Sequence, residues 1–159
     1  MKRYADAEQM FQKLFEYLPI WPGTNDSDYP INYRSIGIAR MHQEHWKEAE
    51  EALQKSVSLF DEQIERAAKS DSEFMRNEHS NNLRMSQDSA LNSLAVVYFR
   101  EQRYAEALKL LERAYEQATK FHAPPKMVPE IVDTGLGISE SAGEVKAMAV
   151  WFGRSVITK

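Results

Sequence analysis

Two amphipathic segments joined by a short polar break dominate the pattern of hydrophobic and polar positions. In the first segment the apolar residues recur at helical spacing: Leu91, Leu94, Ala95 and Tyr98. After Glu101-Gln102-Arg103, a second series continues at the same spacing: Tyr104, Ala107, Leu108, Leu111 and Ala114. A connection of about three residues permits only an antiparallel hairpin. The segment from Asp88 to Phe121 is therefore predicted to be two helices that face each other.

The same spacing returns elsewhere in the chain. Residues 30–63 repeat it with Tyr33, Ile36, Gly37, Trp46, Ala49 and Leu53. Residues 1–19 match only the second helix of such a unit, with Tyr4, Ala7, Phe11, Leu14 and Pro19. Residues 128–159 give a fainter copy, with Ile131, Gly135, Ile138, Ala147 and Trp151.

These positions resemble the tetratricopeptide repeat, a helix–turn–helix unit of about 34 residues. Ala95 stands where that pattern prefers glycine, and Thr119 stands where it prefers proline. The resemblance implies an all-α fold, in which about seven helices form a right-handed superhelical array of antiparallel hairpins, an α-solenoid. A single hairpin cannot bury both of its faces, so neighbouring hairpins are expected to stack into one domain over residues 1–159.

Within that domain, residues 30–63 and 88–121 are predicted to be repeats and residues 128–159 a degenerate repeat. Residues 1–19 are either a half repeat, within a longer array, or a capping helix. Because the repeats starting at Pro30 and Asp88 lie 58 residues apart, residues 64–87 are interpreted as an insertion. We expect an extended hairpin whose helices meet near residues 69–73 and are closed by Phe60, Ile64, Ala68, Phe74 and Met75; a mobile loop is the alternative.

Proline and glycine mark the remaining breaks. The segment from Pro19 to Pro30 is predicted to be a loop, in which Trp21 either packs on the core or lies at the rim of a binding surface. Gly135 and Gly137 fall inside a predicted helix, where glycine costs about 1 kcal/mol relative to alanine, so close backbone packing is expected at both. The apolar closing helix, residues 144–156, should pack on another chain or on sequence beyond these residues.

The composition of the chain mainly argues against certain classes of function. The net charge is −4 and no basic segment is concentrated, which argues against nucleic acid as a partner. No apolar run is long enough to span a membrane, and the N-terminus lacks the apolar core of a signal peptide, so no membrane partner and a cytoplasmic location are expected. The chain has no cysteine, which excludes thiolate metal sites and a cysteine nucleophile.

No constellation of side chains points to catalysis. His42 and His45 lie three residues apart, but a turn separates them and no third ligand stands at a fixed spacing, so no metal site is expected. Neither a glycine-rich phosphate loop nor a nucleophile elbow is present. The chain is therefore expected to be no enzyme and to need no cofactor.

The remaining candidate site is a surface. The resemblance implies that the first helices of successive repeats line a concave groove, which holds an extended peptide or a helix. Carried over by spacing, that groove comprises Arg34, Ile38, Met41, His42, Asn92, Val96, Phe99, Arg100 and Leu136. Asn92 can pair with a peptide backbone, and the two arginines can bind a carboxylate. The alternative is that the apolar members of this set simply pack between neighbouring helices.

The leading hypothesis is thus a non-catalytic protein–protein interaction module, part of a larger scaffold, whose partner is another protein or peptide. A self-associating structural domain, homo-oligomeric through the C-terminal helix, is the second hypothesis. The third is the regulatory part of a larger signalling protein, with the insertion contacting an effector domain.

Overall fold

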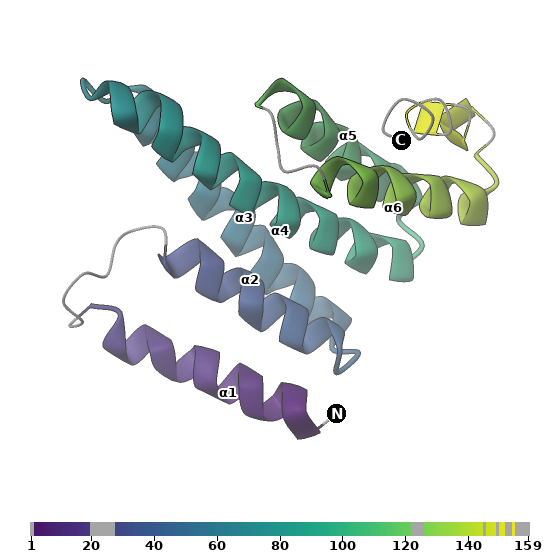
Figure 1. The fold of residues 1–159 in the computed structure, drawn as a ribbon. Helices are drawn as coiled ribbons and strands as arrows, with labels where there is room; N and C mark the ends of the chain where they lie inside the picture. Colours follow the sequence, from purple (N-terminus) through teal and green to yellow (C-terminus); the bar gives the residue numbers. More distant parts are fainter. Residues whose placement is uncertain are drawn as a thin grey trace. The chain divides into compact units, whose positions relative to one another are not determined.

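The computed structural model describes residues 2–19, 28–121, 126–144, 146–148, 150, 151 and 154. The described residues form helices and turns and no strand. Figure 1 shows the helices in chain order: α1 (Lys2–Tyr17), α2 (Asp28–Met41), α3 (Trp46–Ala68), the π-helix η1 (Met75–His79), α4 (Ser80–Arg100), α5 (Tyr104–Lys120) and α6 (Met127–Ala142). The described residues after Glu144 are also helical. The prediction of an all-α fold of about seven helices is confirmed.

The chain forms two compact units, residues 1–90 and 91–159, and the boundary between them lies within α4. The single domain with its four repeat segments stays a prediction. In the first unit α1 packs on α2 and α2 packs on α3 (Figure 1). Trp21 and the rest of residues 20–27 lie outside the described residues.

The α2–α3 hairpin is held by close backbone approach. A Cβ atom on Gly37 would lie 2.6 Å from Cγ of Leu53, closer than carbon atoms can approach without a shift. Leu53 and Ala49 are fully buried in this contact region. The Ser56 hydroxyl, also fully buried, donates a hydrogen bond of 2.7 Å to the carbonyl of Pro30 in the first turn of α2. The small residue of the repeat pattern therefore allows the two helices to interdigitate.

The turns after α2, α4 and α6 have the same backbone geometry. One residue in each adopts a positive φ: Glu44 (62°), Gln102 (62°) and Gly143 (68°). The N–H of the next residue donates to the carbonyl five residues earlier: His45 to Arg40 (3.0 Å), Arg103 to Tyr98 (2.8 Å) and Glu144 to Ser139 (3.0 Å). This is the Schellman arrangement, which satisfies carbonyls at the end of a helix. The backbone thus repeats where the sequence pattern repeats.

The predicted insertion is helical except around Lys69–Ser72. α3 continues to Ala68, the chain is helical again from Glu73, and α3 contacts η1. At the base of this extension the buried Gln87 amide donates to Oδ1 of Asp61 (2.8 Å) and to the carbonyl of Val57 (3.2 Å). The residues on both sides of this break are therefore helical, and their interpretation as an extended hairpin inserted between two repeats stays a prediction.

Two residues expected to close the extended hairpin do not do so. Phe74 is 61% exposed, and Ala68 is exposed while Ala67 is buried. The buried stripe of α3 runs through Phe60, Ile64 and Ala67, so Ala68 lies one step off that face. Phe74 precedes η1, whose wider turn changes the helical phase between Phe74 and the buried part of α4.

Glu8 joins α1 to α2. Its carboxylate accepts hydrogen bonds of 2.8 Å from Nε of Arg40 and 2.8 Å from the Gln43 amide. Burial by itself would raise the pKa of Glu8, but these hydrogen bonds and the arginine charge outweigh it. The pKa of Glu8 therefore lies below its ordinary value.

We expect Glu8→Gln to reduce the free energy of unfolding at pH 7 by about 1 kcal/mol. Because folding lowers the pKa of Glu8, its contribution is present above the unfolded carboxyl pKa and is lost as the pH falls through the folded value. The difference between wild type and variant should thus shrink below about pH 4. Urea unfolding measured from pH 7 to pH 3 checks this; a difference that does not change with pH would contradict it.

In the second unit α5 packs on α6, and Trp151 of the closing helix fits against Gly135. A Cβ atom on Gly135 would lie 2.5 Å from the indole ring of Trp151, which is buried. The close packing expected at Gly135 is confirmed. At Gly137 the expectation is wrong, since no atom of the described residues outside its own backbone surroundings lies within 4 Å of the Cβ position.

The closing helix is tied to α5 by Arg154. Its guanidinium donates two hydrogen bonds to the Glu112 carboxylate, at 2.7 and 2.5 Å, and lies over the rings of Tyr115 (4.1 Å) and Trp151 (4.5 Å). Tyr115 and Trp151 themselves meet edge to face, with ring centroids 5.9 Å apart. The hydrogen bonds lower the pKa of Glu112, so this pair remains ionised over the neutral range.

Candidate functional site

A shallow hollow lies between α4 and α6, the first helices of two successive hairpins. Its volume is about 330 Å³. From α4 it is lined by Val96, Phe99 and Arg100. From α6 it is lined by Asp133, Thr134, Gly137, Ile138 and Ser141. All eight residues belong to the second compact unit.

The hollow has an apolar floor and a charged rim. Val96 and Phe99 are partly buried, and the ring of Phe99 rests against Tyr104 with centroids 5.8 Å apart. Arg100 and Asp133 are exposed and supply one charge of each sign. A surface of this kind can take up an apolar side chain while its rim pairs with polar or charged groups on either side.

The hydroxyl groups in the lining are already engaged. Thr134 donates to the carbonyl of Glu130 and Ser141 to that of Gly137, each at 2.8 Å. Such bonds to the preceding turn of the same helix are satisfied without a ligand. The space above Gly137, by contrast, is open, and the absence of a side chain there gives the hollow its depth.

The structure brings together three of the predicted groove residues, Val96, Phe99 and Arg100. Asn92 lies one turn earlier on α4, and its Oδ1 is buried without a hydrogen-bond partner among the described residues. Leu136 is partly buried on α6 and is absent from the lining of the hollow.

Sequence reasoning missed the α6 residues of the hollow because it was one residue out of register. Aligning Gly135 with Ala95 points to Leu136 as the equivalent of Val96. Counting back from the positive-φ residues of the turns, Gln102 and Gly143, pairs Val96 with Gly137 instead. The glycine at the turn was therefore the signal that could have found them.

The other predicted groove residues lie on α2 or, for His42, directly after it, in the first unit. Arg34 donates to the carbonyl of Ser86 at 3.2 Å, and burial lowers its pKa. The ring of His42 stacks on Tyr4, with centroids 4.2 Å apart. Ile38 and Met41 are partly buried. Arg34 and His42 thus have intramolecular contacts, and a groove that includes these four residues stays a prediction.

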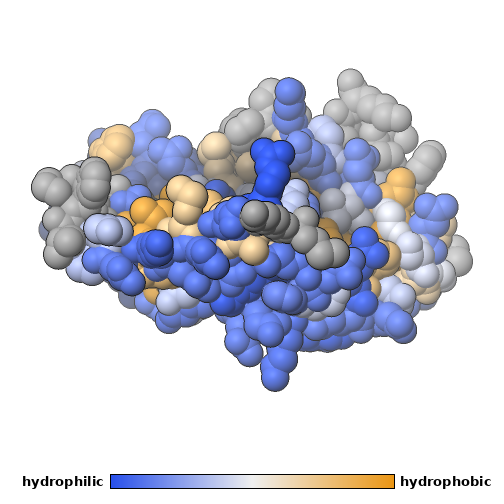
Figure 2. All heavy atoms as spheres, turned by 90° about the horizontal axis from the view of Figure 1, so that it is seen from below, coloured by the Kyte–Doolittle hydropathy of each residue, from blue (hydrophilic) through white to orange (hydrophobic). Residues whose placement is uncertain are grey.

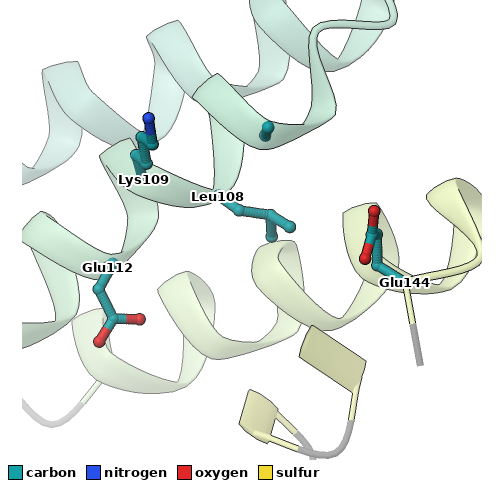
Figure 3. Close-up of a pocket in the computed structure, with 5 residues that line it drawn as sticks. Leu108, Lys109, Glu112 and Glu144 are labelled. Atoms are coloured by element: carbon teal, nitrogen blue, oxygen red, sulfur yellow. The ribbon is translucent and has the colours of Figure 1, made fainter. Parts of the chain in front are cut away.

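A second hollow, of about 350 Å³, lies on α5 and was not expected from the sequence. Figure 3 shows four of its lining residues labelled: Leu108, Lys109 and Glu112 from α5, and Glu144 at the start of the closing helix. The Glu112 carboxylate is engaged by Arg154. This hollow therefore offers two apolar side chains, Ala105 and Leu108, and charged groups of which the Glu112 carboxylate is already paired.

Among the described residues, no group of three or more histidine, aspartate or glutamate side chains is arranged to hold a metal ion. Within the same ranges, no helix has the length and apolar character needed to cross a bilayer.

Comparison with known proteins identifies one segment. A search of curated protein sequences found no match to the chain. A family model described as the tetratricopeptide repeat matches residues 89–116. These residues contain the second half of α4, the turn at Gln102 and most of α5, including the buried Tyr98 and Leu111. Residues 89–116 therefore match the tetratricopeptide repeat, as the sequence pattern predicts for this segment.

Proposed function

We propose that this protein is a non-catalytic protein–protein interaction module, and that the hollow between α4 and α6 binds a short peptide segment of its partner. The observation that carries the proposal is the hollow itself, where an apolar floor, two opposite charges and the open space above Gly137 meet between the matched repeat and α6. Proteins with this repeat generally bind other proteins.

The lining indicates which peptide fits. One apolar side chain would rest on Val96 and Phe99, in the space above Gly137. An acidic group of the peptide would pair with Arg100, and an N–H or a basic group would pair with Asp133. We therefore expect a segment with an apolar residue next to an acidic one.

The test uses peptides selected on the wild-type protein from a random display library, with affinities measured by fluorescence polarisation. Gly137→Trp fills the hollow, and Arg100→Glu reverses one rim charge. Each should weaken binding at least tenfold, which corresponds to about 1.4 kcal/mol. Gly137 has room for a side chain, so the folded structure should persist in the first variant, as its circular dichroism would show.

Lys109→Glu is the matched control, because it makes the same charge change on the exposed face of α5 beside the second hollow. It should leave the affinity unchanged. Equal binding by wild type and Gly137→Trp would contradict the proposal. A loss caused by Lys109→Glu but not by Arg100→Glu would move the binding site to α5.

Self-association through the closing helix is the second candidate function. The observation that favours it is Val150, which is half exposed on that helix although its neighbour Trp151 is buried. Val150→Glu should then shift the protein toward monomer in sedimentation-velocity runs over a range of concentrations, whereas a wild type that stays monomeric throughout would exclude this function.

A further inference from the structure

The start of α1 repeats the start of α5. Arg3-Tyr4-Ala5-x-Ala7 has the same residues as Arg103-Tyr104-Ala105-x-Ala107, and the intervening residue is acidic in both. In α5 these residues follow the turn that joins it to α4. There Arg103 lies over the Tyr98 ring of α4 at 3.8 Å and pairs with Glu106. The sequence of α1 is thus that of a second helix in a hairpin.

In a complete hairpin the corresponding positions are buried. On α3 they are Ala49, Ala52, Leu53 and Ser56, which face α2 through Gly37 and Pro30. On α1 they are Ala7, Met10, Phe11 and Leu14. Met10 is 69% exposed and Leu14 is 43% exposed, and Tyr17 one turn further on is 51% exposed. Figure 2 shows hydrophobic residues open to solvent between hydrophilic ones on the side of the molecule seen from below.

Helix α2 does not cover this face because it contacts another side of α1. Phe15 meets Tyr33 with ring centroids 4.7 Å apart, and Glu8 meets Arg40. The Asn32 amide donates to the carbonyl of Phe11 at 2.8 Å. The apolar arc of α1 is therefore wider than one neighbouring helix can bury, and Met10, Leu14 and Tyr17 form a stripe with i, i+4, i+7 spacing beside the α2 contact.

We propose that the stripe of Met10, Leu14 and Tyr17, with Ala7 beside it, binds an amphipathic helix of a partner polypeptide, antiparallel to α1. The helix that fits has a glycine or alanine opposite Phe11, as Gly37 lies opposite Leu53. Three positions after this small residue, the partner helix carries an aromatic residue on which the Arg3 guanidinium can lie, as Arg103 lies over the ring of Tyr98. The binding energy comes from burial of the apolar stripe, and this surface is separate from the hollow between α4 and α6.

A second copy of the chain is a poorer occupant. Its first helices α2, α4 and α6 are each followed across a turn by a second helix of their own. Such a helix would have to leave its hairpin before it could lie on α1. A helix supplied by another polypeptide has no such cost.

The first experiment supplies the occupant by grafting. Residues 88–102, the α4 sequence with its turn, are placed directly before Arg3 in place of the first two residues, so that the natural junction to Arg103 is reproduced. The graft should raise the midpoint of thermal unfolding by about 5 °C or more. A second graft, with glutamate in place of the alanine copied from Ala95, is the matched control and should give no rise. A graft that does not stabilise would overturn the proposal.

The second experiment presents the occupant in trans, as a labelled synthetic peptide with the sequence of residues 88–102. Fluorescence anisotropy should show saturable binding that Leu14→Glu weakens at least tenfold. Gln9→Glu, an exposed change on the opposite side of α1, should leave the affinity unchanged. Absence of binding to the wild type would overturn the proposal of a separate polypeptide. Dimers in sedimentation that Leu14→Glu dissociates would overturn it in favour of a second copy.

Discussion

Replacing Phe60 with alanine is expected to cost about 3–5 kcal/mol of stability, the largest effect of any single change proposed for this protein. Phe60 is fully buried and is the largest of the side chains in that state. It lies on α3 where the helix continues past the length of a hairpin, between Val57 and Ile64 on the same buried stripe. Truncation leaves a cavity that the surrounding helices fill only in part, so the lost contacts are not recovered. Urea unfolding followed by circular dichroism measures the loss.

Phe74→Ala is the control for this experiment, because the same atoms are removed from the other end of the same extension. Phe74 is 61% exposed, and substitutions at exposed positions usually change stability by less than about 0.5 kcal/mol. Comparable losses in the two variants would contradict the burial described for the tip of the extended hairpin.

Much of the fold could be predicted because the sequence of each helix contains residues that mark its ends and apolar residues that recur on one face. The recurrence of Leu94, Ala95 and Tyr98 before a polar break is enough to define a hairpin, and the family match over residues 89–116 confirms it. The helical state of most of residues 64–87 could also be predicted, since these residues include no proline or glycine that would end a helix. Local sequence determines these features.

The burial of single residues at the tip of the extension could not be predicted. It depends on how the helices on the two sides of the break are rotated about their axes. An ideal helix predicts which residues share a face only while its turn remains regular. The π-helical turn of η1 changes that relation for Phe74, and no residue between Met75 and His79 signals such a turn by its type. Ala67 and Ala68 are adjacent residues of the same type on α3, so their sequence alone does not indicate which of them is buried.

The residues that α4 contributes to the hollow could be predicted, but the prediction for α6 was one residue out of register, for a related reason. Glycine in a helix has two physical uses, close packing and open space, and the sequence does not distinguish them. Gly135 serves the first use beneath Trp151, and Gly137 serves the second in the floor of the hollow. Aligning the repeats on a glycine thus selects a packing position, whereas the turn fixes the register of the whole helix.

The two glycines provide the second large effect, because the same substitution should change stability in opposite directions. Gly137→Ala should stabilise the protein by about 0.5–1 kcal/mol, since alanine favours the helix and its Cβ meets no atom of the described part of the chain within 4 Å. Gly135→Ala should destabilise it by about 1–3 kcal/mol, the usual cost of overpacking. Its Cβ would lie 2.5–2.8 Å from three atoms of the Trp151 ring.

The Trp151 ring cannot easily move aside in the second variant, because Tyr115 meets its ring edge to face and the Arg154 guanidinium lies over it. Displacement would also weaken the ion pair of Arg154 with Glu112. Thermal unfolding of both variants alongside the wild type provides the measurement. Pairing Gly135→Ala with Trp151→Phe, whose smaller ring leaves room for the methyl group, should recover part of the loss relative to Trp151→Phe alone. If both alanine variants were stabilised equally, the close approach of Trp151 to α6 would be wrong.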